Sequence, residues 1–127
     1  MLLRYMNVQS GNGFSVDKNL NGYNPLVEAY AVGGACPDHV VCVDNDLFSF
    51  NAFRRAMEMN IEFIKRTEFS DDFLTVKVIG AWVNWGGDAF IEVSNVLFDR
   101  DSAIALGKER GEEAIWDFKN DCEIKLT

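Results

Sequence analysis

The sequence predicts an α+β domain in which an antiparallel or mixed sheet of about five to seven strands carries two helices. Three observations support this fold class. Apolar residues recur three or four apart over about residues 47–66, as they do in an amphipathic helix. Two apolar segments flank the dipeptide Gly86–Gly87, which is a strong hairpin signal. The length of 127 residues suits a single domain over 1–127.

The N-terminal third is predicted to hold short strands separated by irregular segments. Residues 2–8 indicate a first strand, and residues 9–24 indicate an irregular surface loop because polar residues and glycine dominate them. Residues 26–32 fit either a strand or a helical turn. Residues 39–43 are apolar and β-branched, which predicts a short strand buried on both faces.

The clearest predicted element is a long amphipathic helix over about residues 47–66, whose apolar positions include Phe53, Met57 and Ile64. The Asp-Asn-Asp triplet at 44–46 offers side-chain acceptors for the free N–H groups of the first helical turn. It also places negative charge against the positive end of the helix dipole. We therefore expect this triplet to cap the helix.

Residues 73–85 and 88–98 are predicted to pair as a hairpin. A two-residue Gly-Gly loop would fix its register, with Trp85 opposite Asp88. This register assigns to the core face Val76, Val78, Gly80, Trp82, Ile91, Val93 and Leu97. The second face then receives Trp85 together with Phe90, so it is aromatic near the turn.

A shorter helix over about residues 102–112 is expected next, capped by the polar segment 99–102. Residues 114–118 and 122–126 are predicted to form a closing hairpin. The simplest architecture places both helices on one face of the sheet.

The acidic balance of the chain narrows the classes of partner. The sequence has 20 Asp and Glu against 12 Lys and Arg, a formal net charge of −8. This charge disfavours direct binding to nucleic acid and to anionic membranes, whereas it permits a basic protein partner or serves solubility alone. The sequence shows no long apolar stretch and no signal-peptide pattern in residues 1–7, and its cysteine count is odd, so we expect a soluble protein of the reducing cytoplasm.

One set of residues has the chemistry of a metal site. Cys36, His39, Cys42 and Cys122 are all of the cysteines and the only histidine, and three thiolates with one imidazole suit Zn²⁺. However, His39 and Cys42 would point to opposite faces of the predicted strand, and the chain has no Cys-x-x-Cys pair. We therefore expect no metal and no cofactor, with Cys42 and Cys122 as small core residues.

Trp85 and Phe90 are the leading candidates for a binding surface. The predicted register puts both on the second face of the hairpin, with the carboxylates of Asp88 and Glu92 near them. An aromatic patch exposed there would mark a partner or ligand surface, whereas cover by the first strands would make it ordinary core. The sequence leaves both alternatives open.

Residues 80–118 contain a Gly-x-Trp segment and a hairpin, then Val-x-Phe-Asp-x-x-x-Ala-x-x-x-Gly and Ala-Ile-x-Asp. The positions are Gly80, Trp82, Val96, Phe98, Asp99, Ala103, Gly107, Ala114, Ile115 and Asp117. This segment, about a third of the chain, resembles the C-terminal part of small uncharacterised proteins carried by phages and other mobile genetic elements. The resemblance implies no catalytic residue and suggests an accessory protein that binds host machinery.

These observations favour a small, acidic, non-catalytic accessory protein of a mobile genetic element. Its partner would be a protein, such as a host nucleic-acid-binding or defence protein whose phosphate sites the carboxylates would occupy. The alternative is a small-molecule-binding protein with an aromatic-lined pocket between the sheet and the long helix. An enzyme that uses carboxylates, or His39 with Cys42, is the third hypothesis, and a homodimer through the second sheet face is compatible with all three.

Overall fold

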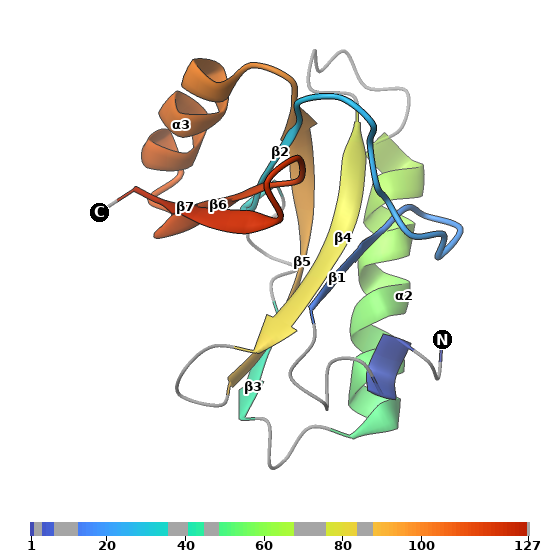
Figure 1. Cartoon of the computed structure of the whole chain (residues 1–127). Coiled ribbons are helices and arrows are strands. Elements are labelled where there is room, and N and C mark those ends of the chain that lie inside the picture. Colours follow the sequence, from blue (N-terminus) through green and yellow to red (C-terminus); the bar gives the residue numbers. More distant parts are fainter. Residues whose placement is uncertain are drawn as a thin grey trace.

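The computed structural model describes residues 1, 4–6, 13–35, 41–44, 49–67, 76–83 and 88–126. It has the α+β fold that the sequence predicts (Figure 1). Its elements in chain order are β1 (Phe14–Val16), β2 (Tyr30–Val32), β3 (Val41–Asp44), α2 (Phe50–Thr67), β4 (Lys77–Val83), β5 (Asp88–Leu97), α3 (Arg100–Glu109), β6 (Ala114–Asp117) and β7 (Cys122–Lys125).

The described strands form one antiparallel sheet of seven strands in the order β1-β4-β5-β2-β6-β7, with β3 paired to β5. The long strand β5 is central. One edge of β5 pairs with β4. Two short strands share its other edge: β2 pairs with residues 95–97, and β3 pairs with residues 88–91. Residues 92–94 therefore lie opposite the interval between β2 and β3, which we call the strand break.

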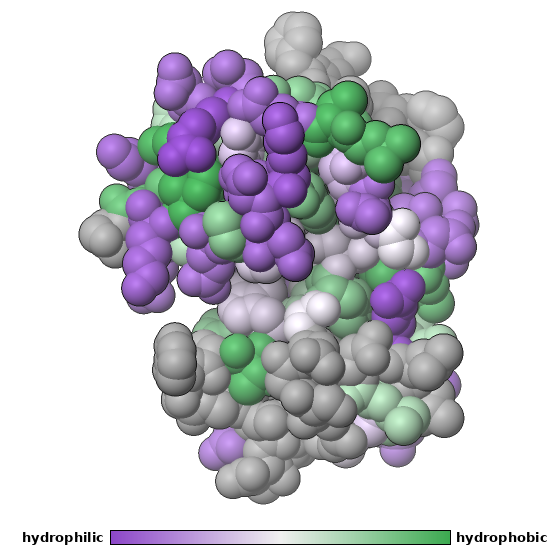
Figure 2. Space-filling model, in the orientation of Figure 1, coloured by the Kyte–Doolittle hydropathy of each residue, from purple (hydrophilic) through white to green (hydrophobic). Residues whose placement is uncertain are grey.

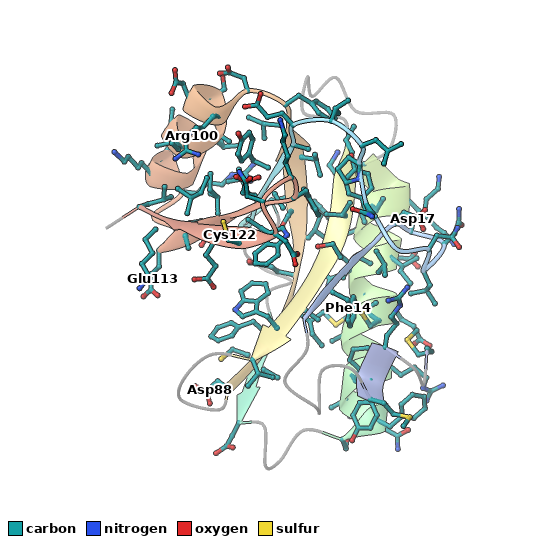
Figure 3. All side chains as sticks on the ribbon, in the orientation of Figure 1. Phe14, Asp17, Asp88, Arg100, Glu113 and Cys122 are labelled. Atoms are coloured by element: carbon teal, nitrogen blue, oxygen red, sulfur yellow. The ribbon has the colours of Figure 1, made fainter. Side chains whose placement is uncertain are left out.

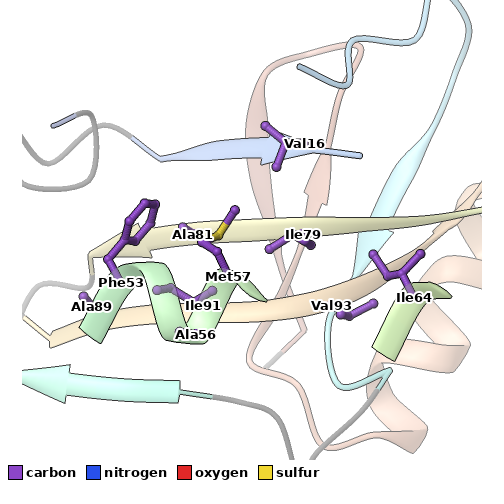
Figure 4. Close-up of a cluster of buried hydrophobic side chains, with 10 residues drawn as sticks. All are labelled: Val16, Phe53, Ala56, Met57, Ile64, Ile79, Ala81, Ala89, Ile91 and Val93. Atoms are coloured by element: carbon purple, nitrogen blue, oxygen red, sulfur yellow. The ribbon is translucent and has the colours of Figure 1, made fainter. Parts of the chain in front are cut away.

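The main core lies between helix α2 and the strands β4 and β5. Phe53 and Met57 on the helix, like Ile79 and Ile91 on the strands, have no exposed surface (Figure 4). The helical period brings the buried positions of α2 onto one side of the helix, as the sequence predicts. This packing fixes which face of the sheet the long helix covers.

A second cluster lies between helix α3 and the strands β2, β5 and β6. Its buried members are Tyr30, Val32, Leu97, Ala103 and Ile115. Gly107 lets the helix approach closely, since a Cβ there would stand 2.6 Å from Leu126 Cδ1. Because Leu97 and Val93 project from the same side of β5, α2 and α3 cover one face of the curled sheet. The predicted one-face arrangement is confirmed.

The predicted register of the β4–β5 hairpin is wrong by one residue. Val83 pairs with Ala89, and Trp82 pairs with Phe90. A shift of one residue moves every side chain of a strand to the opposite face. The observed register gathers five buried apolar side chains of the hairpin under α2, namely Ile79, Ala81, Ala89, Ile91 and Val93. Burial of this set outweighs the register that the Gly-Gly loop implies, and residues 84–87 lie outside the described part of the chain.

The prediction of a strand over residues 2–8 is wrong for the residues that the structure describes. Residues 4–6 form a helical turn, in which the Tyr5 N–H donates to the Met1 carbonyl at 3.1 Å. The turn brings the Tyr5 ring against Phe50 and Phe53 of α2, with centroids 5.4 and 5.6 Å apart. Aromatic packing on the helix thus replaces pairing in the sheet.

One further N-terminal prediction is wrong, and another is confirmed only in part. β1 lies inside the predicted loop over 9–24, because Val16 is fully buried against the main core and its neighbours pair with β4. Of residues 26–32, only Tyr30–Val32 form a strand, and Leu26 is almost completely exposed. Both differences depend on pairing with strands distant in the sequence.

The caps of the two helices differ in how well the sequence predicts them. At the start of α2, Ser49 Oγ accepts the Ala52 N–H at 3.2 Å, a bond that the sequence did not predict. Asp44 ends β3, and residues 45–48 lie outside the described part. At α3 the prediction is confirmed, because Asp99 Oδ2 accepts the backbone N–H and the hydroxyl of Ser102 at 2.9 and 2.7 Å.

Candidate functional site

The face of the sheet opposite the two helices carries the candidate site. Directly paired residues of antiparallel strands project to the same side. Cys42, Phe90 and Trp82 therefore form one row across β3, β5 and β4. Asp44 and Asp88 form the next row toward the end of the sheet. We call these five residues the aromatic–acidic face.

Trp82 and Phe90 form the apolar part of this face. Their rings stack with centroids 5.5 Å apart and an interplanar angle of 12°, and both side chains are half-buried. The indole also lies over Gly80, with Cζ3 3.7 Å from the point where a Cβ would stand. Each ring is therefore held by the other and by the sheet, which gives a rigid apolar surface of the kind that anchors interfaces.

Carboxylates border the aromatic pair. Asp88 is half-buried and Asp44 is exposed, and Figure 3 shows Asp88 at the end of β5 farthest from helix α3. The Cys42 thiol next to them is exposed. Desolvation first, and the negative charge of Asp88 second, raise the pKa of Cys42 above its ordinary value. This environment disfavours the thiolate that a nucleophilic cysteine needs.

Glu92 continues the same side of β5 beyond Phe90 and is buried, with 7% of its surface exposed. It lies opposite the strand break. Burial, followed by the nearby charge of Glu112, raises the pKa of Glu92 to about 7, although the Gly34 N–H donates to its carboxylate. A carboxyl group with this pKa can hold or release a proton near neutral pH.

Glu112 brings a second carboxylate to Glu92. It follows α3, and its Oε1 is buried without a hydrogen-bond partner. A Cβ placed on Gly33 would overlap an oxygen of Glu92 and an oxygen of Glu112, and would stand 2.9 Å from Glu92 Cδ. The two carboxyl groups therefore converge above the Gly33 backbone. Burial is also the main cause that raises the pKa of Glu112.

Arg110 ties the end of α3 to the strand break. Its Nη1 donates to the carbonyl oxygens of Val32 and Gly33 at 3.2 and 3.0 Å, and its Nη2 donates to Asn95 Oδ1 at 2.7 Å. Its positive charge favours the ionised form of both glutamates. The same charge opposes a metal cation at the carboxyl pair, and the described residues contain no group of three or more side chains arranged to bind a metal.

Of the four residues predicted for partner binding, the structure describes three. Phe90 and Asp88 are half-buried on the helix-free face, whereas Glu92 is buried beside Phe90. Trp85 lies outside the described residues. The predicted register places Trp82 on the core face, and the one-residue change of register brings it into the site.

Two of the four residues of the zinc alternative, Cys36 and His39, lie outside the described residues. The other two, Cys42 and Cys122, are exposed free thiols. The expectation that they are core residues is therefore wrong. Both lie on short strands near a margin of the sheet, where Cys42 pairs with Phe90 and Cys122 pairs with Asp117.

Several acidic residues have local structural tasks instead of forming part of the face. Asp17 accepts the backbone N–H groups of Asn19 and Asn21, and Asp117 accepts two backbone N–H groups and the Asn120 amide in the turn after β6. Asp99 caps α3. Turn and cap formation thus explains part of the acidic composition without any partner.

Arg110 and Glu112, which complete the carboxyl pair, were missed because they lie at the end of a predicted helix and 18 or more residues from Glu92. Their local signal is weak. Gly111 adopts a positive φ of 71° after the helix, which turns the chain back toward β2. The Gly33–Gly34 pair is the other hint, since a glycine in a strand often marks the close approach of other groups.

Comparison of the chain with protein-family models, with curated proteins and with solved structures finds no match. Among the described residues, no helix combines the length and apolar composition that a membrane crossing requires. The function of the chain is therefore inferred from the chemistry of the helix-free face.

Proposed function

We propose that this chain is a small non-catalytic binding protein that docks its aromatic–acidic face onto a basic surface of a protein partner. The observation that carries the proposal is the Trp82–Phe90 stack on the helix-free face, bordered by Asp44 and Asp88. Aromatic anchors surrounded by charged residues are typical of binding hot spots.

The charges favour a cationic partner. Asp44 and Asp88 lie in adjacent strands on one side of the stack, and the whole chain carries a net charge of −8. Lys or Arg side chains can pair with these carboxylates while their aliphatic stems cover the aromatic rings. Such pairing guides association and selects the partner more than it adds affinity.

The partner that fits this chemistry best is a host protein that binds nucleic acid, such as a defence protein. Basic sites for phosphate would accept the carboxylates of the face in place of the nucleic acid backbone. We expect the same setting from the resemblance that the sequence of residues 80–118 suggests to proteins of phages and other mobile elements. The chain would then act as an accessory inhibitor.

An oligolysine peptide provides a direct test of the charge requirement. We expect D44N/D88N to bind the fluorescent peptide about threefold to tenfold more weakly than the unaltered chain, since each exposed pair contributes up to about 1 kcal/mol. The control D101N/E109Q removes two exposed acids from α3 and should bind normally. Affinity should also fall steeply with salt. Equal losses in both double variants would overturn the proposal.

The small-molecule alternative has less support. The interface between α2 and the sheet is filled by buried side chains of the main core, among them Phe53, Met57 and Ile91 (Figure 4). A ligand-dependent rise in melting temperature would be its characteristic result.

A further inference from the structure

We infer that Glu92 and Glu112 share a single proton above Gly33, and that this proton locks the end of helix α3 onto the strand break. The pair is thus a pH-sensitive latch within the fold. The inference does not depend on the proposed docking function, because it concerns how two parts of the chain are joined.

The geometry of the pair favours a shared proton. Both carboxyl groups occupy the space above Gly33 that any side chain there would fill. Glu112 Oε1 is buried and accepts no hydrogen bond, which is costly for an ionised oxygen. A proton on Glu92 provides the missing donor, since a neutral carboxyl group has one O–H to give.

In the described part of the chain, the charged groups that act on the pair are one arginine and a further glutamate. Among the described residues, Arg110 is the cation that faces both carboxylates, and three of its hydrogen bonds end on uncharged acceptors. Glu113 adds a further negative charge next to Glu112. Glu92 is buried and Glu112 is half-buried, and two close carboxylates in such a position cannot both ionise at low cost, so one proton stays between them.

The pair joins elements that are distant in the sequence. Glu92 lies on the central strand, whereas Glu112 follows α3 and donates its backbone N–H to the Gly107 carbonyl at 2.9 Å. Loss of the proton would place two negative charges close together above Gly33. Their repulsion would separate the end of α3 from the strand break, and Ala35, whose N–H donates to the Val93 carbonyl at 3.3 Å, would open with it.

Carboxyl ¹³C NMR of the glutamate-labelled chain tests the shared proton. In the unaltered protein, the Glu92 carboxyl carbon should titrate at a pH of about 7, and the Glu112 carboxyl carbon should respond to the same step. In E112Q the Glu92 step should move to lower pH and stay above the ordinary value, because burial remains. The control E109Q, at an exposed position on α3, should leave the step unchanged.

Two results would overturn the inference. One is a Glu92 carboxyl carbon that titrates at an ordinary pH near 4.5 in the unaltered chain. The other is the same Glu92 step in E112Q as in the unaltered chain. If E112Q fails to fold, hydrogen exchange of the backbone amides in the unaltered chain tests the latch instead. The protection of the Ala35 and Glu112 amides should fall as the pH rises through 7, by more than the ordinary pH dependence of exchange accounts for. Protection that does not change would refute the latch.

Discussion

Gly33 shows how much of the candidate chemistry depends on one residue. Its missing side chain leaves room for Glu92 and Glu112 to meet, and its carbonyl accepts from Arg110 at 3.0 Å. A side chain at this position would push apart the two carboxylates or the strand that carries them. The carboxyl pair therefore exists because a glycine directly follows β2, where the chain after α3 returns to the sheet.

At the residue scale, the raised pKa of Glu92 predicts how stability depends on pH. The folded chain holds a proton on this group up to about pH 7, whereas the unfolded chain loses it near pH 4.5. Glu92 therefore contributes most to stability below pH 4.5, and this contribution falls as the pH rises through 7. Its full size is about 3 kcal/mol, since each pKa unit corresponds to about 1.4 kcal/mol.

Urea denaturation of the unaltered chain and of E92Q between these two pH values measures this contribution. The free energy of unfolding of the unaltered chain should fall relative to that of E92Q as the pH rises. Curves that run parallel for the two proteins would show that Glu92 titrates alike in the folded and unfolded states.

At the element scale, helix α2 is held by its buried side. Met57 is fully buried in the main core, whereas Met59, two positions away, is 44% exposed. We expect M57A to lower the free energy of unfolding by about 2–5 kcal/mol, because it leaves a cavity. The matched variant M59A should change it by less than about 0.5 kcal/mol. Thermal or urea unfolding of both variants checks this, and equal losses would contradict the assigned helix face.

The elements also show what sequence could and could not predict. The periodicity of α2, the Asp99 cap of α3 and the β6–β7 hairpin are encoded within a few residues of one another, and their predictions are confirmed. The three-residue strand β1 and the helical turn near Tyr5 depend on partners far along the chain, so local patterns did not identify them.

The candidate site follows the same rule. Phe90 and Asp88 could be placed on the second face from the hairpin alone, whereas Trp82 required the register that burial under α2 selects. Glu112 reaches Glu92 only after α3 has formed and the chain has turned at Gly111. Pairing at this distance leaves no pattern in a single sequence.

At the scale of the whole molecule, hydrophilic and apolar side chains are distributed unevenly. In Figure 2, hydrophilic side chains gather over helix α3 and the β6–β7 hairpin. The aromatic–acidic face lies away from them, on the side of the sheet that carries no helix. A partner that binds hydrophilic side chains without aromatic anchors would meet the first region, whereas a partner that needs aromatic anchors would meet the second.

Chemical-shift mapping on the ¹⁵N-labelled chain, titrated with an oligolysine peptide, distinguishes these two surfaces most directly. If the aromatic–acidic face is the docking site, the largest changes will fall on the Trp82 indole N–H and on the backbone amides of β3 and of residues 88–90. They should diminish as salt is added. Changes concentrated on α3 and the β6–β7 hairpin, with the Trp82 indole signal unmoved, would contradict the account.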